Sequence, residues 1–172
     1  MKILNLGWGG IHLKAEEGIE EITVDLVEPA DVVCDIRKLP FEDDSVDGVY
    51  ASHVLEHFYS HEIDDVLSEW KRVIKPGGKI ILAVPDIIAA MKMALTFGWM
   101  TESCPTAGVG NITPHDIFYG YTPEIKTGKE GMAHKTGFDD ARLKAHMDKH
   151  FTQVTVAKTE GANAQLFAMG IK

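Results

Sequence analysis

One stretch of the chain constrains the fold more than any other. From Lys79 to Val84 every position after the lysine is apolar, and the stretch follows the turn Pro76-Gly77-Gly78. A strand without alternating polar positions is typical of the buried centre of a parallel sheet, which is covered on both faces. The sequence therefore predicts a parallel sheet with this strand in its interior.

An amphipathic helix is expected directly before that turn. Apolar side chains recur there at i, i+3, i+4, i+7 and i+11, a spacing that forms one stripe along a helix. Ser60 is expected to cap its N-terminus, and Lys71, Arg72 and Lys75 crowd its C-terminus. The residues of the stripe are Ile63, Val66, Leu67, Trp70 and Ile74.

Strands and helices alternate over most of the chain. Asp86 is expected to cap a second helix, and residues 139–150 to form a third. The face predicted to be apolar on the second helix consists of Ile87, Ala90, Met91, Ala94 and Leu95. Six further strands are predicted at residues 2–6, 21–26, 31–35, 46–51, 151–158 and 164–171. This alternation indicates an α/β fold with helices on the faces of the sheet, and ligands bind such sheets just after the strands.

Length and composition fit a single domain over residues 1–172. Of these residues 45% are hydrophobic and 25% charged, as in globular proteins. The net charge of -9 argues against nonspecific nucleic-acid binding, because an acidic surface repels phosphates. No stretch approaches the roughly 20 apolar residues of a membrane span. Cys34 and Cys104 are too few for a disulfide framework or a cysteine zinc site, so we expect a cytoplasmic protein.

Five short motifs resemble those of class I S-adenosylmethionine-dependent methyltransferases, most closely the small predicted methyltransferases. The resemblance implies a Rossmann-like three-layer sandwich, with a mostly parallel seven-stranded sheet and an antiparallel C-terminal strand. It also implies S-adenosyl-L-methionine as the cofactor. The motifs, in order, are Leu4-Asn5-Leu6-Gly7-Trp8-Gly9-Gly10, Val24-Asp25, Cys34-Asp35-Ile36 with Leu39-Pro40-Phe41, Ser52-His53-Val54-Leu55-Glu56-His57, and Val73-Ile74-Lys75-Pro76-Gly77-Gly78.

The resemblance assigns roles to the residues after each strand. The glycine turn would hold the methionyl part of the cofactor, because glycine lets the backbone lie close to a ligand. Asp25 would accept hydrogen bonds from the ribose hydroxyls, and Asp35 and Ile36 would bind the adenine. The full set of expected cofactor residues is Asn5, Gly7, Trp8, Gly9, Asp25, Leu26, Asp35, Ile36, Ser52 and His53.

The chain departs from the family pattern near its start. Asn5 stands where an acidic residue is usual, Ile11 replaces the third glycine, and Trp8 occupies a position that is more often small. Only about fifteen residues separate Gly9 from Asp25, too few for a crossover helix plus a strand. We therefore expect a loop or a single helical turn in this first crossover.

The resemblance divides the chain into three parts. Residues 1–86 would form the cofactor-binding half, and residues 151–171 a terminal β-hairpin. Between them, residues 96–136 lack periodicity and carry many glycines and prolines, so we expect an irregular lid or acceptor-binding region. A second subunit is another candidate for closing the site, so a homodimer is possible.

Candidate catalytic residues are the histidines His57, His115 and His134. Methyl transfer needs a base only where the acceptor loses a proton, and a neutral imidazole suits that task. The expected function is methyl transfer from S-adenosylmethionine to an unidentified, small-molecule acceptor. A cofactor-binding protein without transfer activity is the main alternative.

A different interpretation exists for His53-Val54-Leu55-Glu56-His57. It matches H-x-x-E-H, in which two histidines on one helical turn bind zinc and the glutamate is a base. Its place between a strand and the next helix argues against that zinc hydrolase. A nicotinamide-binding domain is disfavoured because His12 stands where the third glycine of its fingerprint belongs. We therefore expect no metal site.

Overall fold

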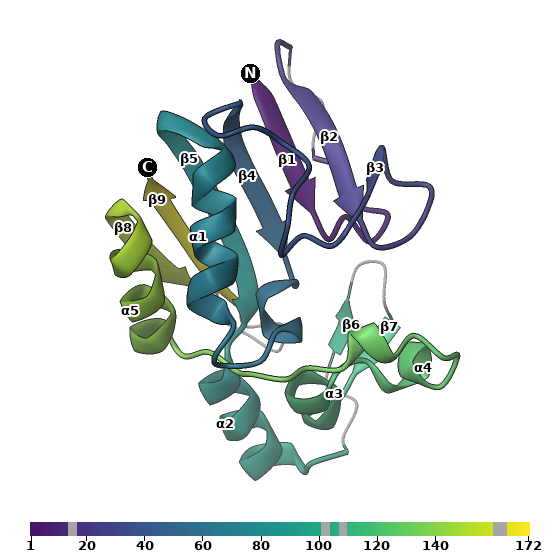
Figure 1. Ribbon diagram of the computed structural model, residues 1–172. Helices are drawn as coiled ribbons and strands as arrows, with labels where there is room; N and C mark the ends of the chain where they lie inside the picture. The colour runs from purple at the N-terminus through teal and green to yellow at the C-terminus, as the bar shows by residue number, and fades with distance from the viewer. Residues whose placement is uncertain (14–16, 101–103, 107–109, 160–164) are drawn as a thin grey trace.

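A computed structural model describes residues 1–13, 17–100, 104–106, 110–159 and 165–172. Its main feature is a seven-stranded sheet with the order β3-β2-β1-β4-β5-β9-β8, in which β9 runs antiparallel to both neighbours (Figure 1). The other pairings are parallel, which confirms the predicted α/β fold and its antiparallel C-terminal pair. The strands are β1 (Lys2–Leu6), β2 (Glu20–Asp25), β3 (Val32–Val33), β4 (Val46–Ser52), β5 (Ile74–Pro85), β8 (Thr152–Lys158) and β9 (Gln165–Ile171).

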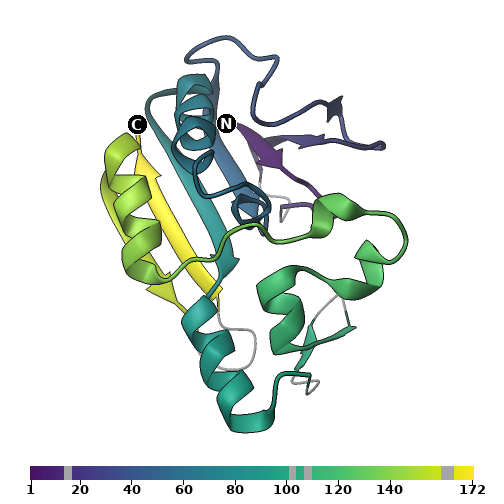
Figure 2. The ribbon, with the colours of Figure 1, turned by 60° about the horizontal axis from the view of Figure 1, so that its bottom comes forward.

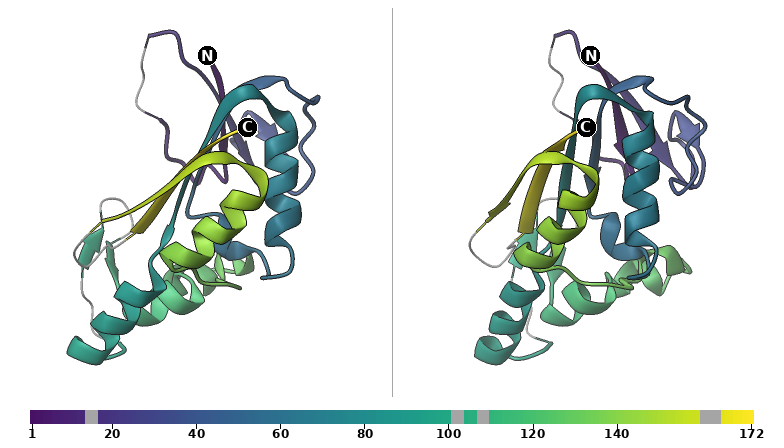
Figure 3. Two further views of the ribbon diagram at one scale, coloured as in Figure 1. Left: turned by 90° about the vertical axis from the view of Figure 1, so that its left-hand side faces the viewer. Right: turned by 60° about the vertical axis from the view of Figure 1, so that its left-hand side comes forward.

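Two helices, α1 (Ile63–Val73) and α5 (Asp140–His150), lie on the same face of the sheet (Figure 3). The predicted stripe is buried, but its last residue, Ile74, begins β5 instead of belonging to α1. The indole N–H of Trp70 donates to the carbonyl of Ile36 at 3.0 Å. The prediction that Ser60 caps α1 is wrong. The helix begins after Glu62, and the Ser60 hydroxyl accepts from Arg142 of α5 at 2.8 Å.

The opposite face of the sheet is less covered than the sequence predicts. Ile81, in the apolar stretch of β5, is 40% exposed, and its neighbours Phe167 and Met169 on β9 are also exposed. Strand β5 is therefore central but not buried on both faces. The reason is that the described helices beside β4 and β5 lie on the other face.

The first crossover is a loop in its described residues, as predicted. Polar side chains hold it in place where a helix would otherwise pack. The amide of Asn5 donates to the carbonyl of Ile11 at 2.8 Å and to the carboxylate of Glu21 at 2.7 Å. Glu21 also accepts from the backbone N–H of Leu13 at 3.0 Å and lies 2.9 Å from Nδ1 of His12.

Asp86 caps the N-terminus of helix α2 (Ile87–Phe97), as predicted. Its side chain accepts hydrogen bonds from the N–H groups of Ile88 and Ala89. The apolar face predicted for α2 is only partly right. Ala90 is buried as predicted, but Met91 and Leu95 are exposed and Met93 is buried in their place. The periodicity did not identify the buried face because nearly every position of this helix is apolar. Within the described residues, no helix is long and apolar enough to cross a membrane.

The segment between α2 and α5, which we call the lid region (residues 98–137), lies beyond the carboxyl ends of the parallel strands (Figure 2). It is built from short elements rather than a plain loop. Its helix α3 begins with a capping box in which the buried Thr113 and Asp116 exchange hydrogen bonds. The elements are β6 (Cys104–Thr106), β7 (Gly110–Ile112), α3 (Pro114–Tyr119), α4 (Thr122–Ile125) and η2 (Glu130–Met132).

Asp64 joins the two helices on the covered face. Its carboxylate lies 2.8 Å from Nδ1 of His146 and 2.6 Å from Nζ of Lys149, both on α5. The hydrogen bond from His146, followed by that from Lys149, holds the pKa of Asp64 well below its usual range. The side chain is 41% exposed, so solvent screens the pair and its contribution is about 1 kcal/mol or less.

We predict that Asp64→Asn lowers the Tm at pH 7 by roughly 1–4 °C. Because the folded pKa of Asp64 lies below the unfolded value of about 3.9, the wild-type advantage is present above pH 4. It shrinks as the pH falls from there through the folded pKa. Thermal unfolding at pH 7 and pH 3 measures this, with Asp65→Asn in the same helical turn as the control. A difference that grows on acidification would contradict the prediction.

Candidate functional site

The turn after β1 has a backbone that only glycine adopts easily. Gly7, Gly9 and Gly10 all have positive φ, and the N–H of Gly7 donates to the carbonyl of Val24 at 2.8 Å. A Cβ on Gly7 would lie 2.4 Å from a methyl carbon of Val54, which follows β4. The turn is thus packed between the ends of β2 and β4.

We predict that Gly7→Ala destabilises the fold by about 2–5 kcal/mol. Positive φ costs an alanine about 1–2 kcal/mol, and the clash with Val54 adds about 1–3 kcal/mol. Gly10→Ala is the matched control, since φ is 86° there and a Cβ meets nothing within 4 Å. Urea unfolding of both variants measures the difference. Equal losses in the two would show that Val54 does not constrain the turn.

Asp25 ends β2 beside this turn. Its carboxylate accepts from the N–H of Gly9 at 3.1 Å and from the N–H of Leu26 at 2.6 Å. A carboxylate has about four acceptor positions, so two stay available to a ligand. The Leu26 side chain is exposed at the same edge.

Asp35 and Ile36 follow β3 in different environments. The guanidinium of Arg37 contacts both carboxylate oxygens of Asp35, at 2.7–3.1 Å, and holds the pKa of this carboxyl below its usual range. Ile36 packs into the core and is only 7% exposed. A ligand therefore meets the Asp35 carboxylate more readily than the Ile36 side chain.

Asn5 and Trp8, both predicted to bind the cofactor, lie at the glycine turn with their side-chain nitrogen atoms buried or hydrogen-bonded. Asn5 is buried and holds the crossover loop, as described above. The Nε1 of Trp8 is buried, and none of the described residues accepts a hydrogen bond from it. The Trp8 ring lies against that of His12, with 5.2 Å between their centroids.

The chain leaves β4 through Ser52 and His53. His53 has φ of 56°, and its N–H donates to the carbonyl of Ala83 at 2.8 Å. The short helix η1 (Leu55–His57) begins only afterwards. His53 and His57 are therefore not on one helical turn, so the H-x-x-E-H arrangement of the zinc hydrolases does not form.

Glu56 is the residue of this site that the sequence analysis left out of its candidates. It is 1% exposed, and its backbone carbonyl accepts from the N–H groups of Lys135 and Thr136 at 2.8 and 3.2 Å. These two bonds bring the end of the lid region onto η1 and place His134 beside the Glu56 carboxylate. The only signal in the sequence was the acidic position of the H-x-x-E-H pattern.

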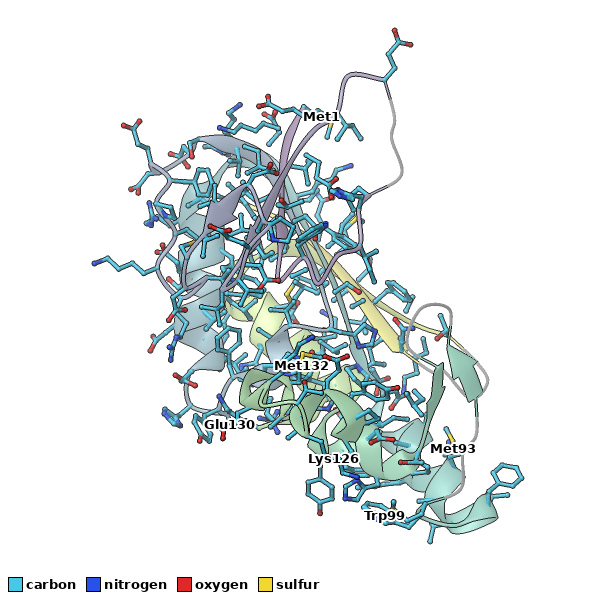
Figure 4. All side chains as sticks on the ribbon, turned by 90° about the vertical axis from the view of Figure 1, so that its right-hand side faces the viewer. Met1, Met93, Trp99, Lys126, Glu130 and Met132 are labelled. Carbon is cyan, nitrogen blue, oxygen red and sulfur yellow. The ribbon has the colours of Figure 1, made fainter. Side chains whose placement is uncertain are left out.

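Two of the three predicted catalytic histidines meet at this point. The rings of His57 and His134 lie 5.0 Å apart between centroids. The third, His115, contacts Trp99 and Tyr119 instead. Trp99 lies at the end of the molecule away from the sheet (Figure 4), so His115 belongs to an outer aromatic cluster.

The Glu56 carboxylate and the histidine rings around it shift one another's pKa values. Burial alone raises the pKa of Glu56, but His53, His57 and His134 together hold it below its usual value. Burial lowers the pKa of His134 despite the nearby carboxylate. For His53, burial also favours the neutral ring, yet Glu56 raises its pKa overall. At neutral pH this favours an ionised Glu56 beside a neutral His134.

A pocket opens beside these groups. It is small, with a volume of about 10 Å³, roughly the room that one water molecule needs. Glu56 and His134 supply polar groups to it, and most of the remaining lining is apolar, including Ile117, Phe118 and Phe138.

Known proteins resemble this chain in sequence and in fold. Residues 12–82 match the family model of a methyltransferase domain. A stretch of 51 residues is 45% identical to sterol 4-C-methyltransferase strm-1 of Caenorhabditis elegans, and covers 30% of this chain but only 15% of that protein.

Solved structures match nearly the whole chain. The 1,6-didemethyltoxoflavin-N1-methyltransferase of Burkholderia thailandensis, with bound S-adenosylhomocysteine, aligns with a TM-score of 0.66 at 17% identity. The alignment covers 99% of this chain and 70% of that one. A SAM-dependent methyltransferase from Archaeoglobus fulgidus aligns with a TM-score of 0.64 at 16% identity, covering 99% and 86%. This chain therefore has the fold of the class I S-adenosylmethionine-dependent methyltransferases, and its residues 12–82 match the model of a methyltransferase domain.

Proposed function

We propose that the protein transfers the methyl group of S-adenosylmethionine to a small-molecule acceptor. The observation that carries the proposal is the set of groups at the carboxyl ends of β1 and β2. There a turn with three glycines of positive φ lies against a carboxylate that keeps two free acceptor positions. Ligands of α/β sheets bind at this edge.

The groups at this edge fit the chemical parts of the cofactor. Asp25 offers acceptors to two ribose hydroxyls. The Asp35 carboxylate already accepts four hydrogen bonds from Arg37, so it accepts from an adenine amine by giving up one of them. The buried N–H of Trp8 lacks a partner among the described residues, and the methionyl carboxylate is an acceptor of the kind that it needs. The lid region lies where the acceptor would enter.

S-adenosylmethionine supplies an electrophilic methyl on a sulfonium, and its sulfur leaves as a neutral thioether. The chain's own task is to align donor and acceptor, which is worth up to roughly 7–11 kcal/mol. An acceptor that bears a proton must also lose it. We assign this to the groups around Glu56, because His57 and His134 converge there and the pocket adjoins them. His115 packs against Trp99 and Tyr119, so we do not assign it to this group.

We predict that Asp25→Ala weakens S-adenosylmethionine binding about tenfold to hundredfold. The loss of a charged acceptor costs on the order of 1.5–3 kcal/mol. Titration calorimetry measures the affinity, and Asp25→Asn separates the charge from the hydrogen bond to Gly9. Glu20→Ala, at the other end of the same strand, is the control and should bind normally. Unchanged affinity in folded Asp25→Ala would refute the ribose assignment.

Turnover separates the enzyme from a cofactor-binding protein that lacks transfer activity. Both bind the cofactor, but only the enzyme forms S-adenosylhomocysteine in the presence of an acceptor. A panel of hydroxyl, amine and thiol acceptors, with product detected by mass spectrometry, tests this. Cofactor binding without product across the panel would favour the binding protein.

A further inference from the structure

We propose that Glu56, His57 and His134 form a binding site for one divalent transition-metal ion. One ligand atom from each of the three residues lies within 4.8 Å of the others. Nε2 of His134 lies 3.9 Å from Oε1 of Glu56. No metal site was predicted, because the H-x-x-E-H pattern lies between a strand and the next helix, but the fold brings His57 and His134 to the Glu56 carboxylate.

Among the described residues, the Glu56 carboxylate has one polar neighbour that is close but poorly aligned, the ring of His53. Both of its oxygens are buried, and none of the described residues donates to them with hydrogen-bond geometry. The nearest cationic group is the half-exposed ring of His53, whose Nδ1 is 3.3 Å from Oε1. A buried carboxylate with so little compensation is costly, and a bound cation would remove that cost.

Both imidazoles are oriented as metal ligands are. Nδ1 of His134 lies 2.8 Å from the carbonyl of Ile117, and Nδ1 of His57 lies 3.2 Å from the carbonyl of Ala133. A carbonyl only accepts, so each Nδ1 carries the proton and each Nε2 keeps a free lone pair. Metal-binding histidines typically have this backbone partner on the second nitrogen.

The donor set selects the kind of ion. Two imidazoles and one carboxylate suit Zn²⁺ and its neighbours, whereas Mg²⁺ and Ca²⁺ prefer oxygen ligands. Four ligands about 2.0–2.1 Å from zinc lie about 3.3 Å from one another, so the side chains need to close in by about half an ångström or more. Three protein ligands leave a fourth position open.

The open coordination position would let the metal activate the methyl acceptor. This part of the proposal rests on the proposed function. The cavity that Glu56 and His134 line has room for about one water molecule, so a water, or the hydroxyl or thiol end of an acceptor that displaces it, can occupy the fourth position. A metal lowers the pKa of a bound hydroxyl or thiol. The acceptor then loses its proton to solvent, its oxygen or sulfur takes the methyl from the sulfonium, and S-adenosylhomocysteine leaves.

Zinc binding tests the proposal directly. Untagged full-length protein, treated with a chelator and then titrated with Zn²⁺, should bind one equivalent by calorimetry and by elemental analysis. Glu56→Gln, His57→Gln and His134→Gln should each weaken binding at least about tenfold to hundredfold. His61→Gln, an exposed histidine just beyond η1, is the control and should bind normally.

The outcomes separate this proposal from the proposed function. Wild-type protein that binds S-adenosylmethionine but no stoichiometric Zn²⁺ would overturn the metal site and leave the methyltransferase proposal standing. Zinc binding that survives both His57→Gln and His134→Gln would place the ion elsewhere and also overturn it. Because a Glu56 variant can fail to fold, circular dichroism accompanies each variant, and the two histidine variants decide the result.

Discussion

The carbonyl oxygen of Glu56 accepts two backbone hydrogen bonds, and the arrangement of the whole site depends on them. They fasten residues 135 and 136 to the short helix that leaves β4. The N–H of His134 adds a bond to the carbonyl of Tyr119, which ties the same point to α3. The lid region is therefore anchored by main-chain groups, and side-chain chemistry around Glu56 can vary without moving the anchor.

Local patterns predicted much of the fold. The stripe of α1, the Asp86 cap and the short first crossover all follow from spacing, capping chemistry and chain length. These local patterns do not predict which elements cover each face of the sheet. The apolar stretch of β5 was taken to be buried on both faces, yet Ile81 is exposed because the neighbouring helices lie on the other side. The hydrophobicity of a strand does not predict against which face of the sheet the helices pack.

The candidate site was only half visible in the sequence. Residues just after the strands, such as Gly7 and Asp25, are local to a turn and were found by their motif. The meeting of Glu56 with His134 depends on how the lid region returns to the sheet, which no local spacing encodes. The H-x-x-E-H pattern contains Glu56, but the helix that the zinc motif requires does not form, since His53 with its positive φ lies outside it.

The position of β9 has a consequence for the order in which the molecule can assemble. This strand inserts between β5 and β8, although both precede it in the chain. During synthesis one edge of β5, with its apolar stretch from Ile80 to Val84, therefore stays unpaired until residues 165–171 have left the ribosome. Open apolar edges invite pairing with other chains. The strand that closes this apolar edge of β5 is therefore synthesised after the six other strands of the sheet.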